Sequence, residues 1–247
     1  MQHFTYDDTS LPIRDDIKLA YRAFWQNLSR PGSWWTGSER IAIAQEVRNA
    51  TQCDFCAARK HAVSPYAFKG EHQNDGVLSE AAVDAVHRIV TDQGRITSSW
   101  VDNLVKLGLT KEAYVELSGV VVSFLSVDEF NRALGLKLER LPDALPGEPT
   151  GYRPAQAVEG TGFVPMIPVD GATGDESDLW QNGMTANVVR ALTLVPNALR
   201  DWTNLAAAQY LSMQGMANLD RQEGRSLNRM QMELVAGRVS AINQCFY

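Results

Sequence analysis

The stretch ERIAIAQEVRNATQCDFC, residues 39–56, decides our interpretation of the fold, because a helical pattern leads into a pair of cysteines. Ser38 is a residue type that caps helix N-termini, and apolar residues follow it at helical spacing, among them Ile41, Ala44 and Val47. The pattern therefore predicts a helix that begins at residue 39 and continues into the Cys53-x-x-Cys56 motif.

Similar helical patterns occur later in the chain. Residues 78–90 place several apolar side chains on one face, and Thr110 is a typical cap for a long helix through Ala133, with Gly135 as its stop. Three more helices are expected over residues 187–194, 197–213 and 225–242, with Met230, Leu234 and Val235 buried in the last. Strand patterns are short and broken by proline, so we expect an all-α protein.

A segment rich in proline and glycine divides the chain. Six of the ten prolines lie between Leu141 and Val169, and such a segment supports neither a long helix nor a central strand. We therefore predict a helical unit over residues 1–140, a linker or arm over 141–176, and a smaller, partial helical unit over 177–247.

The composition is that of a globular protein: of the 247 residues 45% are hydrophobic, and the net charge is −6. The negative charge argues against nucleic acid or an anionic membrane as the main partner. The N-terminal residues do not resemble a signal peptide and no apolar stretch is long enough to span a bilayer, so we expect a cytoplasmic protein. Thiols are kept reduced there, and a C-x-x-C pair then indicates redox chemistry or metal binding.

Cys53 and Cys56 are the first candidates for catalysis. On a helix they would lie on neighbouring turns of one face, where a reducible disulfide can form or one thiol can be stabilised as thiolate. Lys60 shares that face and would lower a thiol pKa, while His61 reaches it only at a bulge or a helix end. Glu46 lies two turns before Cys53 and is expected to relay a proton or to orient a histidine.

Two other interpretations of the cysteines stay open. The pair can be half of a zinc site completed by His61 or His72, or both thiols can be buried as small apolar groups. We favour the redox pair, and predict neither a metal nor a cofactor, because a structural zinc site usually shows two ligand pairs at standard spacing. His3, His72 and His87 are interpreted as surface histidines or as histidines with satisfied hydrogen bonds.

The C-terminal stretch ELVAGRVSAINQCFY, residues 233–247, repeats the pattern of residues 41–55. A shift of 192 positions superposes four identical residues, including Cys53 on Cys245, and in both copies the cysteine follows a helical segment. Two amphipathic helices can agree by chance, but we favour a true repeat because cysteine is the scarcest residue type in this chain.

Residues 39–56 and, more closely, residues 233–247 resemble the alkylhydroperoxidase AhpD / carboxymuconolactone decarboxylase superfamily. The predicted helix that ends before Gly135 also resembles the helix that follows this motif in the family, so that the resemblance covers roughly half of the chain. It implies an all-helical AhpD-like bundle. In the redox-active branch of the family, a glutamate on one helix is followed by C-x-x-C and then by a histidine.

The resemblance also implies a division of roles between the two thiols. The second cysteine of the family pair attacks the peroxide, so Cys56 would become a sulfenic acid and Cys53 would resolve it as a disulfide. At the family's glutamate and histidine positions this chain has Ile41 and Lys60 instead. We therefore propose the neighbouring acid and base, Glu46 and His61, as substitutes.

The second copy keeps the family glutamate as Glu233 and has a single cysteine, Cys245, before the sequence stops at Tyr247. Relatives of this type continue with a second thiol. One hypothesis is an in-frame UGA codon that is read as selenocysteine in the native host, and ordinary truncation or a frameshift is the alternative.

The leading hypothesis is an antioxidant enzyme, either a thiol-dependent peroxidase or a thiol–disulfide oxidoreductase. Its partners would be a small-molecule hydroperoxide and a dithiol reductant or redox protein. An acid–base enzyme of the carboxymuconolactone decarboxylase type is the alternative, and a non-catalytic oligomeric helical protein is the third. Because homo-oligomers are common in the superfamily, we also expect a homo-oligomer, with neither nucleic acid nor a membrane as a partner.

Overall fold

Helices make up the regular secondary structure of the residues that the computed structural model describes, which are 2–74, 76–160, 162–181, 183–217, 224–243 and 245. Within these ranges the one β-type contact is an isolated antiparallel bridge between Val158 and Met166. The all-α class predicted from the sequence is therefore confirmed.

The first part of the chain forms a series of helices, and the longest connection between them covers residues 61–79. They are α1 (Asp15–Leu28), α2 (Gly37–Ala50), α3 (Asp54–Lys60), α4 (Glu80–Thr91), a 3-10 turn (Gln93–Arg95) and α5 (Ser98–Lys106). The cap of α2 is Thr36 and not the predicted Ser38, because Thr36 and Glu39 form a reciprocal capping box that satisfies two backbone N–H groups. α4 begins after Ser79, whose side chain accepts from the backbone N–H of Ala82.

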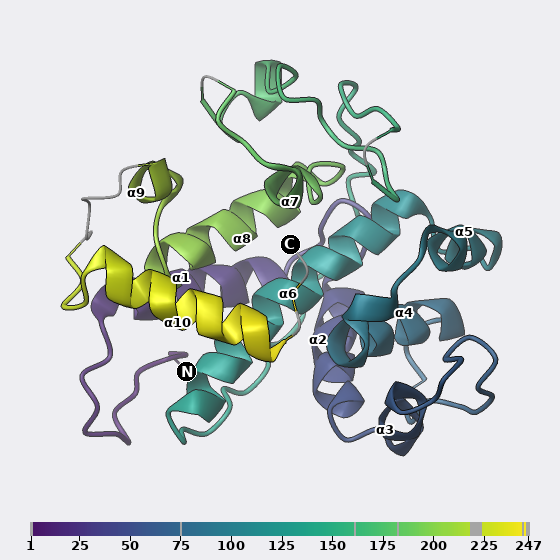
Figure 1. The fold of residues 1–247 in the computed structure, drawn as a ribbon, viewed down its shortest axis with the longest axis horizontal. Coiled ribbons are helices and arrows are strands. Elements are labelled where there is room, and N and C mark those ends of the chain that lie inside the picture. The colour runs from purple at the N-terminus through teal and green to yellow at the C-terminus, as the bar shows by residue number, and fades with distance from the viewer. Residues whose placement is uncertain are drawn as a thin grey trace.

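The long helix α6 (Lys111–Ala133) organises the packing of the others. It begins and ends as its sequence predicts: Thr110 accepts from the N–H of Ala113, and the chain turns away at Gly135, where φ is 68°. α6 packs against α2, α4 and α8 (Pro196–Gln209), and Figure 1 shows it crossing the middle of the molecule between them. Its side chains Leu117, Val121 and Phe124 are completely buried in the core that these helices share.

In its described residues, 141–160 and 162–176, the segment rich in proline and glycine holds no long helix, as its prolines predict, and has one 3-10 turn (Gly174–Glu176). Its first part lies along the loop after α1. The N–H of Leu145 donates to the carbonyl of Ser29 at 2.7 Å, and the N–H of Gly151 donates to the carbonyl of Ser33 at 2.7 Å. The unit boundaries at residues 141 and 177 stay predictions.

The C-terminal helices are α7 (Asn187–Arg190), α8, α9 (Met213–Ala217) and α10 (Arg229–Ile242). α8 packs against α1 and α6 and joins the main core. The expected burial of apolar residues in α10 is wrong, because Met230, Leu234 and Val235 are 79%, 74% and 58% exposed, and Met232 is the buried residue of this helix. Figure 1 shows the cause, since α10 lies on the outside of the bundle.

Candidate functional site

The polypeptide breaks its helix just before the first cysteine. α2 ends at Ala50, a turn follows, and Cys53 is the N-cap of α3 with an extended backbone at φ −77° and ψ 115°. Asp54 favours the new start, since a carboxylate in the first turn interacts well with the positive end of the helix dipole. The predicted continuous helix through both cysteines is therefore wrong. Cys53 precedes α3, and Cys56 lies in its first turn.

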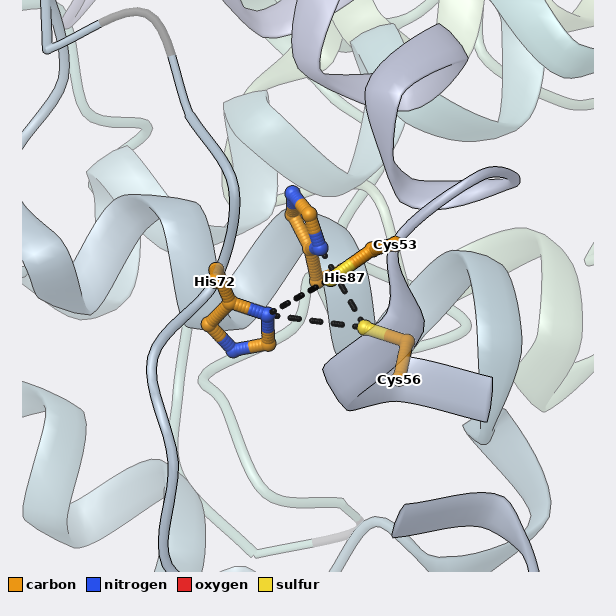
Figure 2. A group of neighbouring side chains, drawn as sticks. All are labelled: Cys53, Cys56, His72 and His87. Carbon is orange, nitrogen blue, oxygen red and sulfur yellow. Dashed lines mark hydrogen bonds between the residues drawn. The ribbon is translucent and has the colours of Figure 1, made fainter. Parts of the chain in front are cut away.

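The two cysteines lie beside two histidines from different elements (Figure 2). His72 comes from the loop between α3 and α4, and His87 comes from α4. The Sγ atom of Cys56 is 3.2 Å from Nδ1 of His87 and 3.5 Å from Nδ1 of His72, and the Sγ atom of Cys53 is 3.8 Å from Nδ1 of His72. One sulfur or nitrogen atom of each of these four residues, here called the thiol–histidine cluster, lies within 4.8 Å of the others.

Each histidine of the cluster turns its second ring nitrogen towards a carboxylate. Nε2 of His87 is 3.0 Å from Oε2 of Glu46, and Nε2 of His72 is 3.0 Å from Oδ1 of Asp84. The first pair spans two helices, because α2 packs directly against α4. A carboxylate at Nε2 holds the proton on that nitrogen, so that Nδ1 of a neutral imidazole presents its lone pair to the sulfur atoms.

Asp84 is held by several donors besides His72. Nη1 of Arg59 lies 2.6 Å from its Oδ1, and the indole N–H of Trp100 donates to its Oδ2 at 2.9 Å. Burial alone would raise the pKa of this carboxyl, but the hydrogen bonds from His72 and Arg59 outweigh it and hold the pKa far below its usual range. Asp84 is therefore a fixed negative charge behind His72.

The charges of the cluster follow from these contacts. Burial opposes ionisation of Cys53, but hydrogen bonds from the backbone N–H groups of Cys56 and Gln73 and from His72 lower its pKa to about 7. Burial also opposes protonation of His72, yet Asp84 and the two sulfur atoms raise its pKa to about 9. Burial is the largest influence on His87 and lowers its pKa. At neutral pH His72 is therefore protonated, and Cys53 beside it is partly ionised to the thiolate. His87 is neutral and can accept a proton.

A positive charge near the thiols was expected from Lys60, and Arg59 supplies it. The Arg59 side chain is buried, and its Nη2 donates to Sγ of Cys56 at 3.8 Å, while Lys60 is exposed. The Arg59 guanidinium also lies over the ring of Phe55, 5.2 Å from its centroid. Arg59 thereby connects Cys56 with Asp84.

A cavity of about 490 Å³ adjoins the cluster. His72 lines this cavity and also contacts both thiols, so it connects the two. The walls combine the aromatic residues Phe55, Tyr66, Phe68 and Trp100 with charged residues, among them Asp84. The guanidinium of Arg88 lies in the same wall, 4.6 Å from the ring centroid of Tyr66 and 5.2 Å from that of Trp100.

The structure brings together three of the residues selected from the sequence, namely Cys53, Cys56 and Glu46. It leaves His61 outside the cluster, because α3 ends at Lys60 and His61 is its exposed C-terminal cap. The histidine that contacts Cys56 and Glu46 is His87 and not His61.

The residues of the second copy lie apart from the cluster, on and after α10. Glu233 is exposed and contacts Tyr210 and Arg229, and Cys245 is exposed. Gln244, Phe246 and Tyr247, which belong to the predicted repeat, lie outside the described residues.

The sequence interpretation missed His72 and His87 as partners of the thiols. A signal for His87 exists, since it is four residues after Val83 and three before Val90, on the apolar face of the predicted helix, and it is completely buried. His72 lies in a loop without periodicity, and only the zinc alternative considered it. Its position depends on the tertiary contact with Asp84.

Comparisons of the chain with protein-family models, with curated proteins and with solved structures give no match. Among the described residues, none of the helices has the length and apolar character that crossing a membrane requires. The functional interpretation therefore depends on the geometry of the thiol–histidine cluster.

Proposed function

We propose that the protein is a thiol-dependent peroxidase or thiol–disulfide oxidoreductase of the AhpD-like type, with Cys56 as the attacking thiol. One observation carries this proposal. Sγ of Cys56 is 3.2 Å from Nδ1 of His87, whose Nε2 is 3.0 Å from Glu46, so that thiol, imidazole and carboxylate form a continuous proton relay. A thiol becomes a nucleophile when an adjacent base accepts its proton, and the carboxylate stabilises the imidazolium that results.

In the first step the thiolate of Cys56 attacks the terminal oxygen of a hydroperoxide. The O–O bond breaks, the sulfur is oxidised to a sulfenic acid, and the alkoxide leaves as an alcohol with the proton that His87 had accepted. The relay thus returns to its starting state. His87 acts first as a base and then as an acid.

In the second step Cys53 attacks the sulfenic sulfur of Cys56, and the products are a disulfide and water. Its pKa of about 7 suits this role, because an attacking thiol is most effective when its pKa is near the ambient pH. A dithiol or a reduced redox protein then supplies the two electrons that restore both thiols.

The aromatic cavity supports an organic hydroperoxide as the substrate. Phe68 and Trp100 offer it apolar contacts, and Arg88 offers a positive charge to a polar or anionic group. The charge of Arg88 is partly balanced, because its buried Nε and Nη1 lie 3.8 Å from a carboxylate oxygen of Asp84 and 4.0 Å from one of Asp92. A peroxide in the cavity would approach the thiols past His72.

The proposal is tested by peroxide consumption with a dithiol reductant. We expect Cys56→Ser to lower the rate to the background of the free reductant and Cys53→Ser to stop multiple turnover. Cys245→Ser is the matched control, because this thiol is exposed and lies outside the cluster, and it should leave the rate unchanged. Equal rates in all three variants would overturn the proposal.

A further inference from the structure

The thiol–histidine cluster has the composition of a metal site. Two sulfur and two imidazole nitrogen atoms, from Cys53, Cys56, His72 and His87, lie within 4.8 Å of one another. Two thiolates and two imidazoles are one of the sets of four ligands that bind Zn²⁺ tetrahedrally. Figure 2 shows that all four side chains converge from different directions on one point.

The distances within the cluster agree with a tetrahedron. With Zn–S bonds of about 2.3 Å and Zn–N bonds of about 2.05 Å at tetrahedral angles, a sulfur and a nitrogen ligand lie about 3.5 Å apart. Three of the four sulfur–nitrogen distances across the cluster are 3.2, 3.5 and 3.8 Å, and the fourth, between Cys53 and His87, is within 4.8 Å. A zinc ion would therefore require only small side-chain adjustments.

The surroundings of the two histidines provide a second, independent observation. Both rings direct Nδ1 into the cluster and present Nε2 to a carboxylate, with Glu46 behind His87 and Asp84 behind His72, each at 3.0 Å. Histidines that bind zinc almost always donate their other N–H in this way, which fixes the ring and raises its basicity as a ligand. A pair of histidines that merely fill the core would not need two such carboxylates.

We propose that Cys53, Cys56, His72 and His87 bind one Zn²⁺ ion in the reduced protein, and that oxidation of the two thiols to a disulfide releases it. Binding displaces the protons held by the thiols and by Nδ1 of His72, and the charges of the ion and the two thiolates cancel in the buried site. Since all four coordination positions are taken by the protein, the bound ion protects the thiols.

The release step balances as a two-electron oxidation. The two thiolates lose two electrons and form the S–S bond. A hydroperoxide takes up these electrons with two protons and yields an alcohol and water, and Zn²⁺ leaves because the disulfide no longer offers it two anionic ligands. Zinc binding itself is independent of the proposed peroxidase activity, and only the release by peroxide rests on it.

The test measures zinc binding to the full, reduced chain by competition with a chromophoric chelator, and metal content by mass spectrometry. We expect one Zn²⁺ per chain, and at least a hundredfold loss of affinity in Cys56→Ser and in His72→Ala. Cys245→Ser and His61→Ala are matched controls that change the same residue types outside the cluster, and both should bind like the wild type. Circular dichroism verifies that each variant is folded.

Two further measurements keep the test decisive if a ligand variant does not fold. Asp84→Asn and Glu46→Gln leave all four ligands in place and should weaken zinc binding about 10–100-fold. Co²⁺ in place of zinc should give the visible spectrum of a tetrahedral site with thiolate charge-transfer bands. If the reduced wild type binds zinc no more tightly than micromolar, or if Cys56→Ser binds it equally well, the metal site is excluded.

The outcomes for the metal site and for the peroxidase are separable. Zinc binding without peroxide turnover would support the metal site and exclude the peroxidase. Turnover by a protein that binds no zinc would do the reverse. If both are observed, excess Zn²⁺ should inhibit the peroxidase reaction, and a chelator should restore it.

Discussion

The helices α2 and α10 are two versions of one local structure in different surroundings. A shift of 192 positions places Gly37–Ala50 on Arg229–Ile242 with both ends matched, and each helix has 14 residues and begins with a capping box. The caps, Thr36 and Asn228, correspond under the same shift. Each helix ends shortly before a cysteine, so related local sequences have produced the same helix twice.

The two helices differ in what surrounds them. α2 is covered by α4 and α6, and its Ile43 is completely buried, while the corresponding residue of α10, Val235, is 58% exposed. Glu46 of α2 reaches His87 on α4, and the corresponding residue of α10 is the exposed Arg238. A capped helix followed by a cysteine therefore does not by itself bring histidines to the thiol. The histidines come from α4 and from the loop before it.

The largest effect is expected from the base of the relay. His87→Gln removes the group that accepts the proton of Cys56 and should lower peroxide turnover about 10²–10⁴-fold. His61→Gln is the matched control, because this histidine is the exposed cap of α3, and it should have the wild-type rate. Equal losses in the two variants, measured by peroxide consumption, would mean that the relay is wrongly assigned.

The burial of α2 predicts a difference in stability from α10. Ile43→Ala should lower the free energy of unfolding by about 2–5 kcal/mol, because it leaves a cavity in the core. Val235→Ala, at the corresponding position of α10, should change it by less than about 0.5 kcal/mol. Urea denaturation of both variants measures the difference, and similar values would show that α10 is buried to the same degree as α2.

A smaller effect is expected from the carboxylate behind His87. Glu46→Gln keeps a hydrogen-bond acceptor at Nε2 but removes the negative charge that stabilises the imidazolium, so turnover should fall about 10–100-fold. Arg238→Gln changes the corresponding position of α10 and should have no effect on the rate. If Glu46→Gln also matched the wild type, the carboxylate would not take part in the relay.

The smallest differences concern the two caps. Thr36→Ala should lower the free energy of unfolding by about 0.5–2 kcal/mol, because α2 is part of the core and the backbone N–H of Glu39 loses the hydroxyl that accepts from it. Asn228→Ala removes the same type of cap from α10, which is on the surface, so it should leave global unfolding unchanged and increase local opening. Hydrogen exchange of the two helices distinguishes these effects. Equal losses of global stability would contradict the comparison.

The sequence predicts the local structure well and the assembly of the site only in part. Thr110 and Gly135 delimit α6 correctly, because caps and stops depend on neighbouring residues. Cys53 and Cys56 were recognisable from their spacing. The position of His87 beside Cys56 depends on the packing of α4 against α2. The position of His72 depends on a loop that contacts Asp84. No periodic pattern in the sequence predicts either contact.

Burial was the other property that the sequence did not predict correctly. Both helices have apolar residues at several matched positions, for example Ile43 and Val235, so the pattern predicts a buried face for both. Which of two such helices is covered depends on the elements that pack against it. In this protein the cover of α2 comes from α4 and α6.

The position of the first oxidised sulfur shows most directly whether the thiol beside His87 performs redox chemistry. The Cys53→Ser variant is used because it lacks the resolving thiol. It is treated with a single equivalent of hydroperoxide and a trap for sulfenic acids. Mass spectrometry of its peptides then identifies the labelled cysteine. We expect the trap to label Cys56 and to leave Cys245 unlabelled. Label on Cys245 with Cys56 unmodified, or equal label on both, would contradict this expectation.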